Sequence, residues 1–329
     1  MTINRIFAVA SLILAGVISS RAQPAAVQQF QNTQLAQQQQ TILTNLTVGK
    51  PTPELYQGEN LDVGPQRILR IKPHVTYFDV VADSQIFYTD DANFAQNPDM
   101  IGSAVFVNTI QVAFAPPAMK FGPGKFAPTV GFASQWYNYW NNRISSLDFE
   151  AQTLFGGGKY TIGNWQIGGG ANYTRLVDQS SYDQSYAEIM PTFGVQRVFP
   201  IGDKMLLAVG DQIDYHFTAV PTMDGLVRGD INDRFDDTVS LTFSWELTRH
   251  LILQPFYRFQ FSNYKNNTLQ TSDRNDYLHT FGVTLAYYFN KNLSLRTFFN
   301  YSRKLSDDTF TPEYHEYDGG LGASLDFKF

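Results

Sequence analysis

The C-terminal stretch Gly319–Phe329 constrains the fold of this chain more than any other part of the sequence. From Leu321 onward every second residue is apolar, and the residues between them are small or polar. Strict alternation of this kind is typical of a β-strand with one apolar face and one polar face. The chain stops on an aromatic residue that is in register with the apolar face. We therefore expect a final strand with one face toward an apolar environment and the other face toward water.

The N-terminus has the pattern of a secretory signal peptide. An apolar run from Ile6 to Ile18 follows Arg5 and leads to a Ser-Arg-Ala sequence that ends at Ala22, with small residues where signal peptidase requires them. The run is shorter than the roughly 20 residues of a membrane-spanning helix, so we expect cleavage after Ala22 and not a membrane anchor. No later apolar run approaches that length, so membrane insertion has to use strands.

Composition narrows the possible functions. Aromatic residues make up 15% of the 329 residues and charged residues only 16%, against about 25% charged residues in soluble domains. Cysteine is absent, which excludes disulfides and thiolate chemistry. The net charge is −6, and removal of the signal peptide takes away two arginines and no acid, so we expect no nucleic-acid binding. We find no metal-ligand pattern and no cofactor motif, and expect neither a metal nor a cofactor.

From His74 onward the sequence divides into stretches of alternating hydrophobicity. We expect about twelve strands, at 74–88, 103–115, 128–140, 149–160, 165–176, 185–199, 205–218, 236–247, 251–264, 276–289, 293–304 and 318–329. Long connections at 90–102, 141–148, 177–184, 221–235, 265–275 and 306–317 alternate with short ones at 161–164, 201–204, 248–250 and 290–292, with 116–127 as a long exception. This pattern predicts an all-β fold, a transmembrane antiparallel up-and-down β-barrel with long loops at one end and short turns at the other.

The terminal strand, with Leu325, Phe327 and Phe329 on its apolar face, resembles the last strand of bacterial outer-membrane β-barrels. The stretch from Pro51 to Gln66, followed by 77–90, resembles the start of members of the β-barrel porin type 2 family. The resemblance implies a protein of the bacterial outer membrane, surrounded by outer-membrane lipid, whose terminal strand is the assembly signal that the barrel assembly machinery reads. It also implies external long loops and periplasmic short turns.

The region before the strands is different in composition. Residues 23–48 are rich in Gln and Ala, and Phe30, Leu35 and Ile42 recur roughly at helical spacing. A short helix and a flexible tether both fit, and the composition favours the tether. The next residues are punctuated by Pro and Gly, as in an extended linker. We therefore divide the chain into a signal peptide (1–22), a Gln/Pro-rich periplasmic tether and linker (23–73) and an outer-membrane β-barrel (74–329).

Alternation assigns most side chains to a lipid face or a lumen face. Aromatic residues are expected in two belts at the membrane interfaces, with Trp136, Trp140, Tyr173, Tyr215, Tyr277 and Tyr301 at the external level and Phe114, Trp165, Phe199, Tyr287, Phe289 and Phe329 at the internal level. Asp211 falls on the lipid face, where a charge costs a few kcal/mol. We expect a bulge or a shifted register at this residue.

The lumen is expected to be polar and of mixed charge. Pore-lining residues on this assignment are Asp79, Asp83, Gln85, Glu150, Glu188, Asp214, His216, Glu246, Arg258, Arg296 and Lys304. Such a lining suits a narrow water-filled pore, and the excess of acids indicates a mild cation preference. In the alternative interpretation the charges pair across the lumen and hold a nearly closed barrel together.

Two functions remain open. Barrels of about eight strands are filled by their own side chains and those of sixteen or more contain a channel, so twelve strands lie between these cases. We expect a porin-like channel for passive diffusion of small hydrophilic solutes or ions. The alternative is a non-conducting structural or surface-display barrel whose external loops bind partners. The oligomeric state stays open.

Enzymatic activity is not expected. Asp214 and His216 resemble the Asp-x-His pair of the outer-membrane omptin proteases, but the sequence has no Asp-x-Asp pair to complete that site. His279 is followed by Thr280, and not by the x-Ser of the outer-membrane phospholipase barrels.

Overall fold

The computed structural model describes Phe30 and residues 75–95, 98–221, 229–265, 274–308, 311 and 313–329. The expected signal peptide and all of the expected tether and linker except Phe30 lie outside the described residues. Within the described ranges, no helix is long and apolar enough to span a bilayer.

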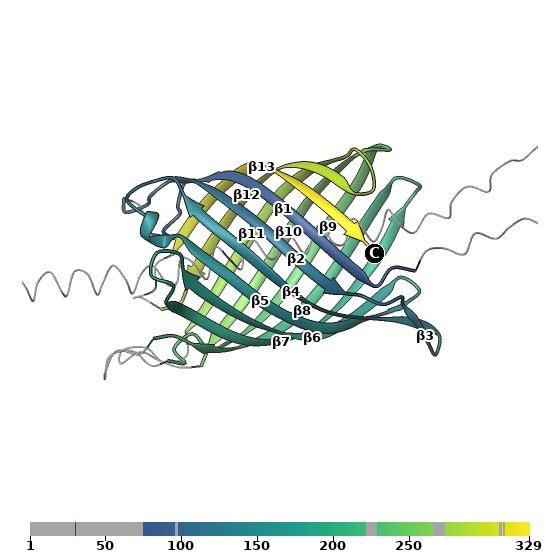
Figure 1. Cartoon of the computed structure of the whole chain (residues 1–329), viewed down its shortest axis with the longest axis horizontal. Helices are drawn as coiled ribbons and strands as arrows, with labels where there is room; N and C mark the ends of the chain where they lie inside the picture. The colour runs from purple at the N-terminus through teal and green to yellow at the C-terminus, as the bar shows by residue number, and fades with distance from the viewer. Residues whose placement is uncertain are drawn as a thin grey trace, which may run out of the picture.

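Twelve antiparallel strands form a closed barrel (Figure 1), as the sequence predicts. Strands that follow one another along the chain are hydrogen-bonded neighbours, and β13 closes the ring on β1. The strands are β1 (Phe78–Thr89), β2 (Ser103–Phe114), β4 (Gly124–Tyr139), β5 (Phe149–Ile162), β6 (Trp165–Asp178), β7 (Gln184–Ile201), β8 (Met205–Ala219), β9 (Arg234–Thr248), β10 (Leu251–Tyr264), β11 (Asn275–Tyr288), β12 (Leu293–Ser306) and β13 (Tyr314–Lys328). A short 3₁₀ helix, Ser145–Leu147, lies between β4 and β5.

Long and short connections alternate around the ring. The β1–β2, β4–β5, β6–β7, β8–β9, β10–β11 and β12–β13 connections gather at one end, which we call the long-loop end, and the other connections lie at the short-turn end. The C-terminus lies at the short-turn end, on the right in Figure 1. One additional strand, β3 (Met119–Phe121), pairs only with the beginning of β4 and projects from the short-turn end. This hairpin accounts for the long exception at 116–127, and Gly122 at its turn has a positive φ of 55°.

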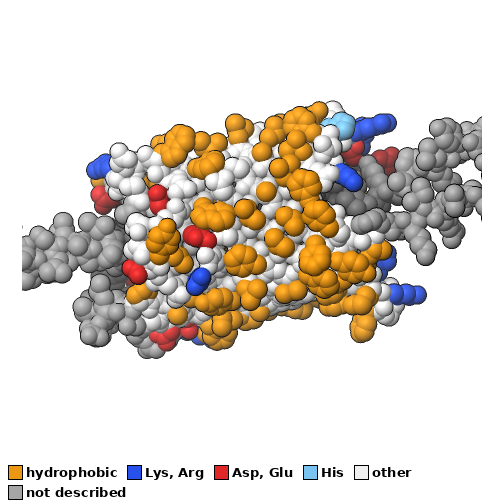
Figure 2. All heavy atoms as spheres, in the orientation of Figure 1, with side chains coloured by type: hydrophobic (Ala, Val, Ile, Leu, Met, Phe, Trp, Pro, Cys, Tyr) orange, Lys and Arg blue, Asp and Glu red, His pale blue; other side chains and the backbone are white. Residues whose placement is uncertain are grey.

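Side chains alternate between the outer surface and the lumen along every barrel strand. Hydrophobic side chains cover much of the outer flank, and most charged side chains in this view lie toward the two ends (Figure 2). Exposed aromatic residues occur at both levels, including Trp140, Tyr173 and Tyr277 toward the long-loop end and Phe114, Trp165, Tyr287, Phe289 and Phe329 at the short-turn end. This arrangement is that of the two interfacial belts of a transmembrane barrel.

Asp211 lies on the outer face, but the expected bulge or register error is wrong. The pairings of β8 with β7 and with β9 run without a shift, and Asp211 lies opposite Val195 and Val239. Asp237 on β9 also points outward, and its carboxyl group interacts with that of Asp211. The acid on the outer face is therefore accommodated in regular strand pairing, beside a second acid, and no irregularity of β8 removes it from that face.

Glycine runs on β5 and β6 let two strands approach closely at the short-turn side of the barrel. Gly157 pairs with Gly170, and a Cβ atom built on Gly170 would lie 2.4 Å from the carbonyl oxygen of Gly156. That contact involves backbone, so a larger residue forces the strands to move. A Cβ atom on Gly168 would have its nearest neighbour at 3.9 Å, which is ordinary contact.

We expect Gly170→Ala to destabilise the barrel by about 1 to 3 kcal/mol, because it overpacks this site. Gly168→Ala, on the same strand and face, is the matched control and should stay close to wild type. Urea unfolding of the protein in lipid vesicles, followed by tryptophan fluorescence, measures both variants. Equal stability of the two variants would contradict the close-approach argument.

Candidate functional site: the lumen of the barrel

The short-turn half of the lumen contains a cavity of about 920 Å³, which we call the vestibule. Small residues from β5 to β8 line much of its wall, including the glycine runs described above. Amide side chains project into the same space from neighbouring strands, and Arg258 on β10 is also part of the lining. The amides are Gln111, Gln166, Asn172, Gln196 and Gln212. This part of the lumen therefore offers polar groups among small and apolar ones and is large enough for a small hydrophilic molecule.

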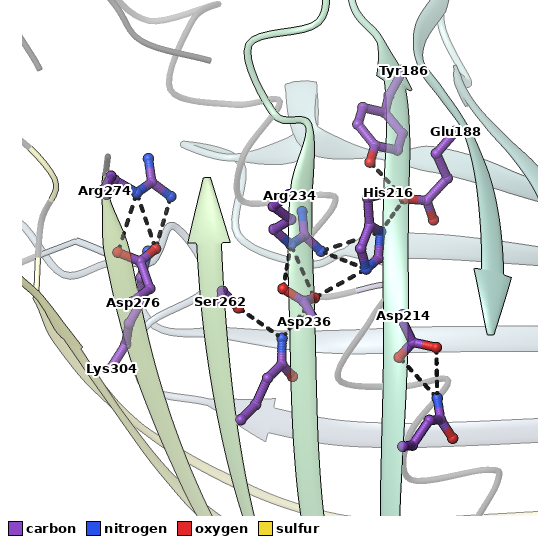
Figure 3. Close-up of polar contacts among 12 residues, drawn as sticks. Tyr186, Glu188, Asp214, His216, Arg234, Asp236, Ser262, Arg274, Asp276 and Lys304 are labelled. Atoms are coloured by element: carbon purple, nitrogen blue, oxygen red, sulfur yellow. Dashed lines mark hydrogen bonds and ion pairs between the residues drawn. The ribbon is translucent and has the colours of Figure 1, made fainter. Parts of the chain in front are cut away.

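A network of buried charges occupies the lumen wall toward the long-loop end (Figure 3). His216 on β8 lies between two carboxylates, with Nδ1 2.8 Å from Oε2 of Glu188 and Nε2 3.0 Å from Oδ2 of Asp236. Arg234 donates from Nε to both oxygens of Asp236, at 3.1 and 3.0 Å. Each of these four side chains is at most 4% exposed. The two carboxylates face two cationic groups when both ring nitrogens of His216 carry protons, so the network is then electrically neutral.

Neighbouring polar side chains complete the hydrogen bonds of this network. The Tyr186 hydroxyl donates to Glu188 at 2.7 Å, and Gln260 donates to Asp236 at 3.0 Å. Gln212 donates to both oxygens of Asp214, which lies two residues before His216 on β8 and closer to the vestibule. Because these partners are fixed side chains of adjacent strands, the network joins the walls of β7, β8, β9 and β10 and narrows the lumen.

Three further ion pairs extend this polar wall to β11, β12 and β1. Asp276 accepts from Arg274 at 2.8 Å and from Lys304 at 3.0 Å. Arg296 donates through Nη2 to Asp83 and to Gln85, both at 2.8 Å, and its Nη1 also contacts Asp83. These contacts close the ring across the β1–β13–β12 junction, because residues of the first strand meet a residue of the penultimate strand.

The opposite wall of the long-loop end is apolar. Buried side chains from β1, β2 and β4 to β7 form one cluster that contains Phe87, Val105, Val107, Tyr137, Tyr139, Phe149, Ala151, Leu176 and Tyr186. Residues of the connecting loops join it, namely Ala92, Ile144, Leu147 and Val220, with Ile101 and Ile231 packed against it. Described residues of the β1–β2, β4–β5 and β8–β9 connections are therefore buried against this wall of the lumen.

Phe30 belongs to this cluster and is only 1% exposed. This residue comes from the N-terminal region, far from the strands in sequence, so the region has at least one residue inside the barrel. Sequence analysis placed Phe30 on a possible helical face but gave no indication of its partners. Its burial adds a large aromatic side chain to the closure of the long-loop end.

A group of acids lies beside the same end of β1 and β13. Thr89 donates to Glu316 at 2.9 Å, and Asp91 in the β1–β2 loop accepts from the backbone N–H of Ala95 at 2.9 Å. Burial raises the pKa of Asp91 to about 7, and the nearby negative charge of Asp90 acts in the same direction. Within the described part of the chain, no three His, Cys, Asp or Glu residues are arranged to hold a metal ion.

The structure places ten of the eleven expected pore-lining residues on the lumen face. They are Asp79, Asp83, Gln85, Glu188, Asp214, His216, Glu246, Arg258, Arg296 and Lys304. The structure brings Glu188 together with His216, and Asp83 and Gln85 together with Arg296. Asp79 lies at the short-turn end, 3.7 Å from Lys328. Leu325, Phe327 and Phe329 are exposed on the outer surface.

The assignment of Glu150 to the lumen is wrong. Glu150 points outward and accepts hydrogen bonds from Ser134 at 2.6 Å and Gln152 at 2.8 Å. Its neighbours Phe149 and Ala151 point inward, into the apolar cluster. At this end of β5 the apolar side chains face the lumen and the polar ones face outward, opposite to the expected assignment.

Arg234, Asp236 and Asp276 are luminal residues that the sequence analysis did not select. Arg234 was missed because the strand was expected to begin at 236, whereas β9 begins at Arg234. Asp236 and Asp276 are the first residues of their expected strands, next to the long loops, and were not selected. Every second residue from Arg234 to Ser240 is polar, so extending the alternation backwards by one step would have found Arg234. Charged residues near a loop are easily assigned to the loop, and this ambiguity hides luminal charges at strand ends.

The fold has similarity to solved outer-membrane barrels. An outer membrane channel from Pseudomonas putida F1 has a TM-score of 0.50 and 12% identity, with 84% of this chain and 100% of that chain covered. The fold is that of an outer-membrane β-barrel. The transport unit of the autotransporter AIDA-I from Escherichia coli has 10% identity, 80% and 94% coverage and a TM-score of 0.46. The β domain of the Bordetella autotransporter BrkA has 12% identity, 76% and 100% coverage and a TM-score of 0.44.

These likenesses are to the fold alone. No protein-family model matches the chain, and no curated protein matches it significantly in sequence. The resemblance to the β-barrel porin type 2 family therefore stays a prediction.

The charge network gives a test by substitution. We expect Asp236→Ala to destabilise the barrel by about 3 to 5 kcal/mol, because it leaves Arg234 buried without its carboxylate partner. The double variant Arg234→Met/Asp236→Leu removes both charges and should recover most of that loss. Urea unfolding in vesicles measures the three proteins, and an Asp236→Ala variant as stable as wild type would contradict the ionic pairing.

Substitution of Phe30 tests whether this residue helps to close the lumen at the long-loop end. Truncation of a buried Phe to Ala costs about 3 to 5 kcal/mol of packing. We expect Phe30→Ala to leave the barrel folded, because the strands keep their hydrogen bonds, and to increase the open probability in single-channel recordings. Phe121→Ala, which alters an exposed residue of β3, is the control. Recordings identical to wild type would show that Phe30 does not restrict the lumen.

Proposed function

We propose that this protein is an outer-membrane diffusion channel for small hydrophilic solutes or ions. The observation that carries the proposal is the vestibule, a polar cavity of about 920 Å³ inside a closed twelve-stranded barrel. Side chains fill barrels of about eight strands, whereas in this twelve-stranded barrel they leave a cavity open. The amide and hydroxyl groups of the wall replace part of a solute's hydration shell, as they do in other polar pores.

The proposed channel is closed at rest at its long-loop end. The inward-folded loops, Phe30 and the charge network supply that closure, and a passing solute requires their displacement. Loops are usually the least stable part of a barrel and open without unfolding of the strands. This arrangement favours small solutes and slow, gated passage over the steady flux of a wide pore.

The same closure favours a second function. A barrel whose lumen is permanently blocked can serve as a structural or surface-display protein, with its long loops as the contact surface for partners. Buried loop residues such as Ala92 and Val220 support this alternative, because they tie the loops to the barrel wall. Single-channel conductance distinguishes the two functions, because the diffusion channel conducts and the permanently blocked barrel does not.

The cellular setting is part of the proposal. A signal peptide cleaved after Ala22 would bring the chain across the inner membrane, and the exposed Leu325, Phe327 and Phe329 would be read by the barrel assembly machinery. The short-turn end then faces the periplasm and the long loops face outward. The chain would sit in outer-membrane lipid, without cofactor or enzymatic activity.

The test is single-channel recording of the mature protein, residues 23–329, in a planar lipid bilayer. We expect discrete openings from a mostly closed state, with more frequent openings in Phe30→Ala. Heat-modifiability on a gel checks that each sample is folded. Folded protein that never conducts, with or without Phe30, would exclude the channel and leave the display barrel as the better account.

A further inference from the structure

Arg258 differs from the other luminal arginines in having no carboxylate partner. Among the described residues, Arg234, Arg274 and Arg296 each pair with an aspartate, but the guanidinium of Arg258 makes only a hydrogen bond of 3.4 Å to the hydroxyl of Thr280. The Nε atom of Arg258 is buried and without a partner in this part of the chain. The side chain is 4% exposed, so bulk water does not replace the missing partner freely.

The same guanidinium lines the vestibule, so the cavity has an unsatisfied cation in its wall. Lys159 on β5 is a second cationic lining residue for which the described structure contains no ion pair, and β5 and β10 lie on nearly opposite sides of the ring in strand order. The third cation of the lining, Lys328, lies 3.7 Å from Asp79 and 3.6 Å from Asp326. Asp211 is also a lining residue, but its side chain lies on the outer face of β8, so its charge is not counted within the cavity. The free charge within the vestibule is therefore positive.

We infer that the vestibule binds the anionic group of a small hydrophilic solute, a carboxylate or a phosphate, on the guanidinium of Arg258. A planar guanidinium presents paired N–H donors that match two oxygens of such a group, and burial makes that charge-assisted bond strong. Ser240 and Thr238 on the adjacent strand are also vestibule residues with short side chains, which leave room beside Arg258 and supply hydroxyl groups. Lys159 attracts the anion from the other side of the cavity.

This inference rests on the proposed function, because it names the class of solute that the channel admits. It also reverses the cation preference that the excess of acidic residues in the sequence indicates. Asp83, Glu188, Asp236 and Asp276 lie against cationic groups outside the vestibule. The number of acidic residues along the strands therefore does not give the sign of the charge in the vestibule.

The first experiment measures binding without a membrane. Isothermal titration of the mature protein in detergent at low ionic strength uses gluconate and inorganic phosphate as probes. We expect saturable binding of at least one probe, weakened about tenfold or more in Arg258→Met and less in Arg258→Lys, which keeps the charge but loses the paired donors. Arg175→Met is the matched control, because Arg175 is exposed and bonds Gln152 on the outer face.

Heat-modifiability checks the folding of each variant, and Arg258→Lys decides the outcome if Arg258→Met does not fold. Absence of binding by the wild type, or equal binding by wild type and the Arg258 variants, would overturn the inference. Bilayer recordings in a KCl gradient then test conduction separately, with a reversal potential expected on the anion side and shifted toward zero in Arg258→Met. Conduction without anion binding overturns only this inference, and binding by a silent barrel overturns only the channel.

Discussion

Backbone N–H and C=O groups that cross a bilayer find no water, so each of them needs a partner within the protein. In this chain the pairing of β1 with β13 meets that requirement, because it joins the first and last strands of a sheet whose edges would otherwise be unpaired. Closure has a second consequence, since it brings Asp83 on β1 within reach of Arg296 on β12. The Asp83–Arg296 pair therefore exists only in the closed ring, and it reinforces the closure that creates it.

The two halves of the lumen differ in the side chains that fill them. At the short-turn half, glycines on β5 and β6 remove side-chain volume and leave the vestibule, which is lined in part by amide and hydroxyl groups. At the long-loop half, large residues fill one wall, and ions with fixed partners such as His216 and Asp236 fill the other. A buried ionic network adds little net stability but strongly penalises any arrangement that leaves one charge alone. It fixes which side chains meet and gives the narrow part of the lumen one defined shape.

Local pattern was sufficient to predict the strands and their order. β8 was expected at 205–218 and runs from Met205 to Ala219, because alternation and the short turn before it both mark its ends. The lumen was harder to predict, since Glu150 and Phe149 exchange faces where the barrel rises above the bilayer. Contacts between residues distant in sequence were out of reach. The sequence around Phe30 does not indicate that this residue is buried in the cluster that contains Tyr137. The sequence around Arg258 does not indicate that its guanidinium has no carboxylate partner.

Arg258 follows from the same constraint as the ion pairs. An arginine buried beside a polar cavity loses hydration, and in a lumen built from paired charges a partner was available at many neighbouring positions. Thr238, Ser240 and Thr280 occupy the adjacent positions instead, and a single aspartate there would have neutralised the guanidinium at lower cost. Retention of the unpaired cation at the wall of a cavity is explained when the missing carboxylate or phosphate comes from the solute. The vestibule and the unpaired guanidinium are then two parts of one site.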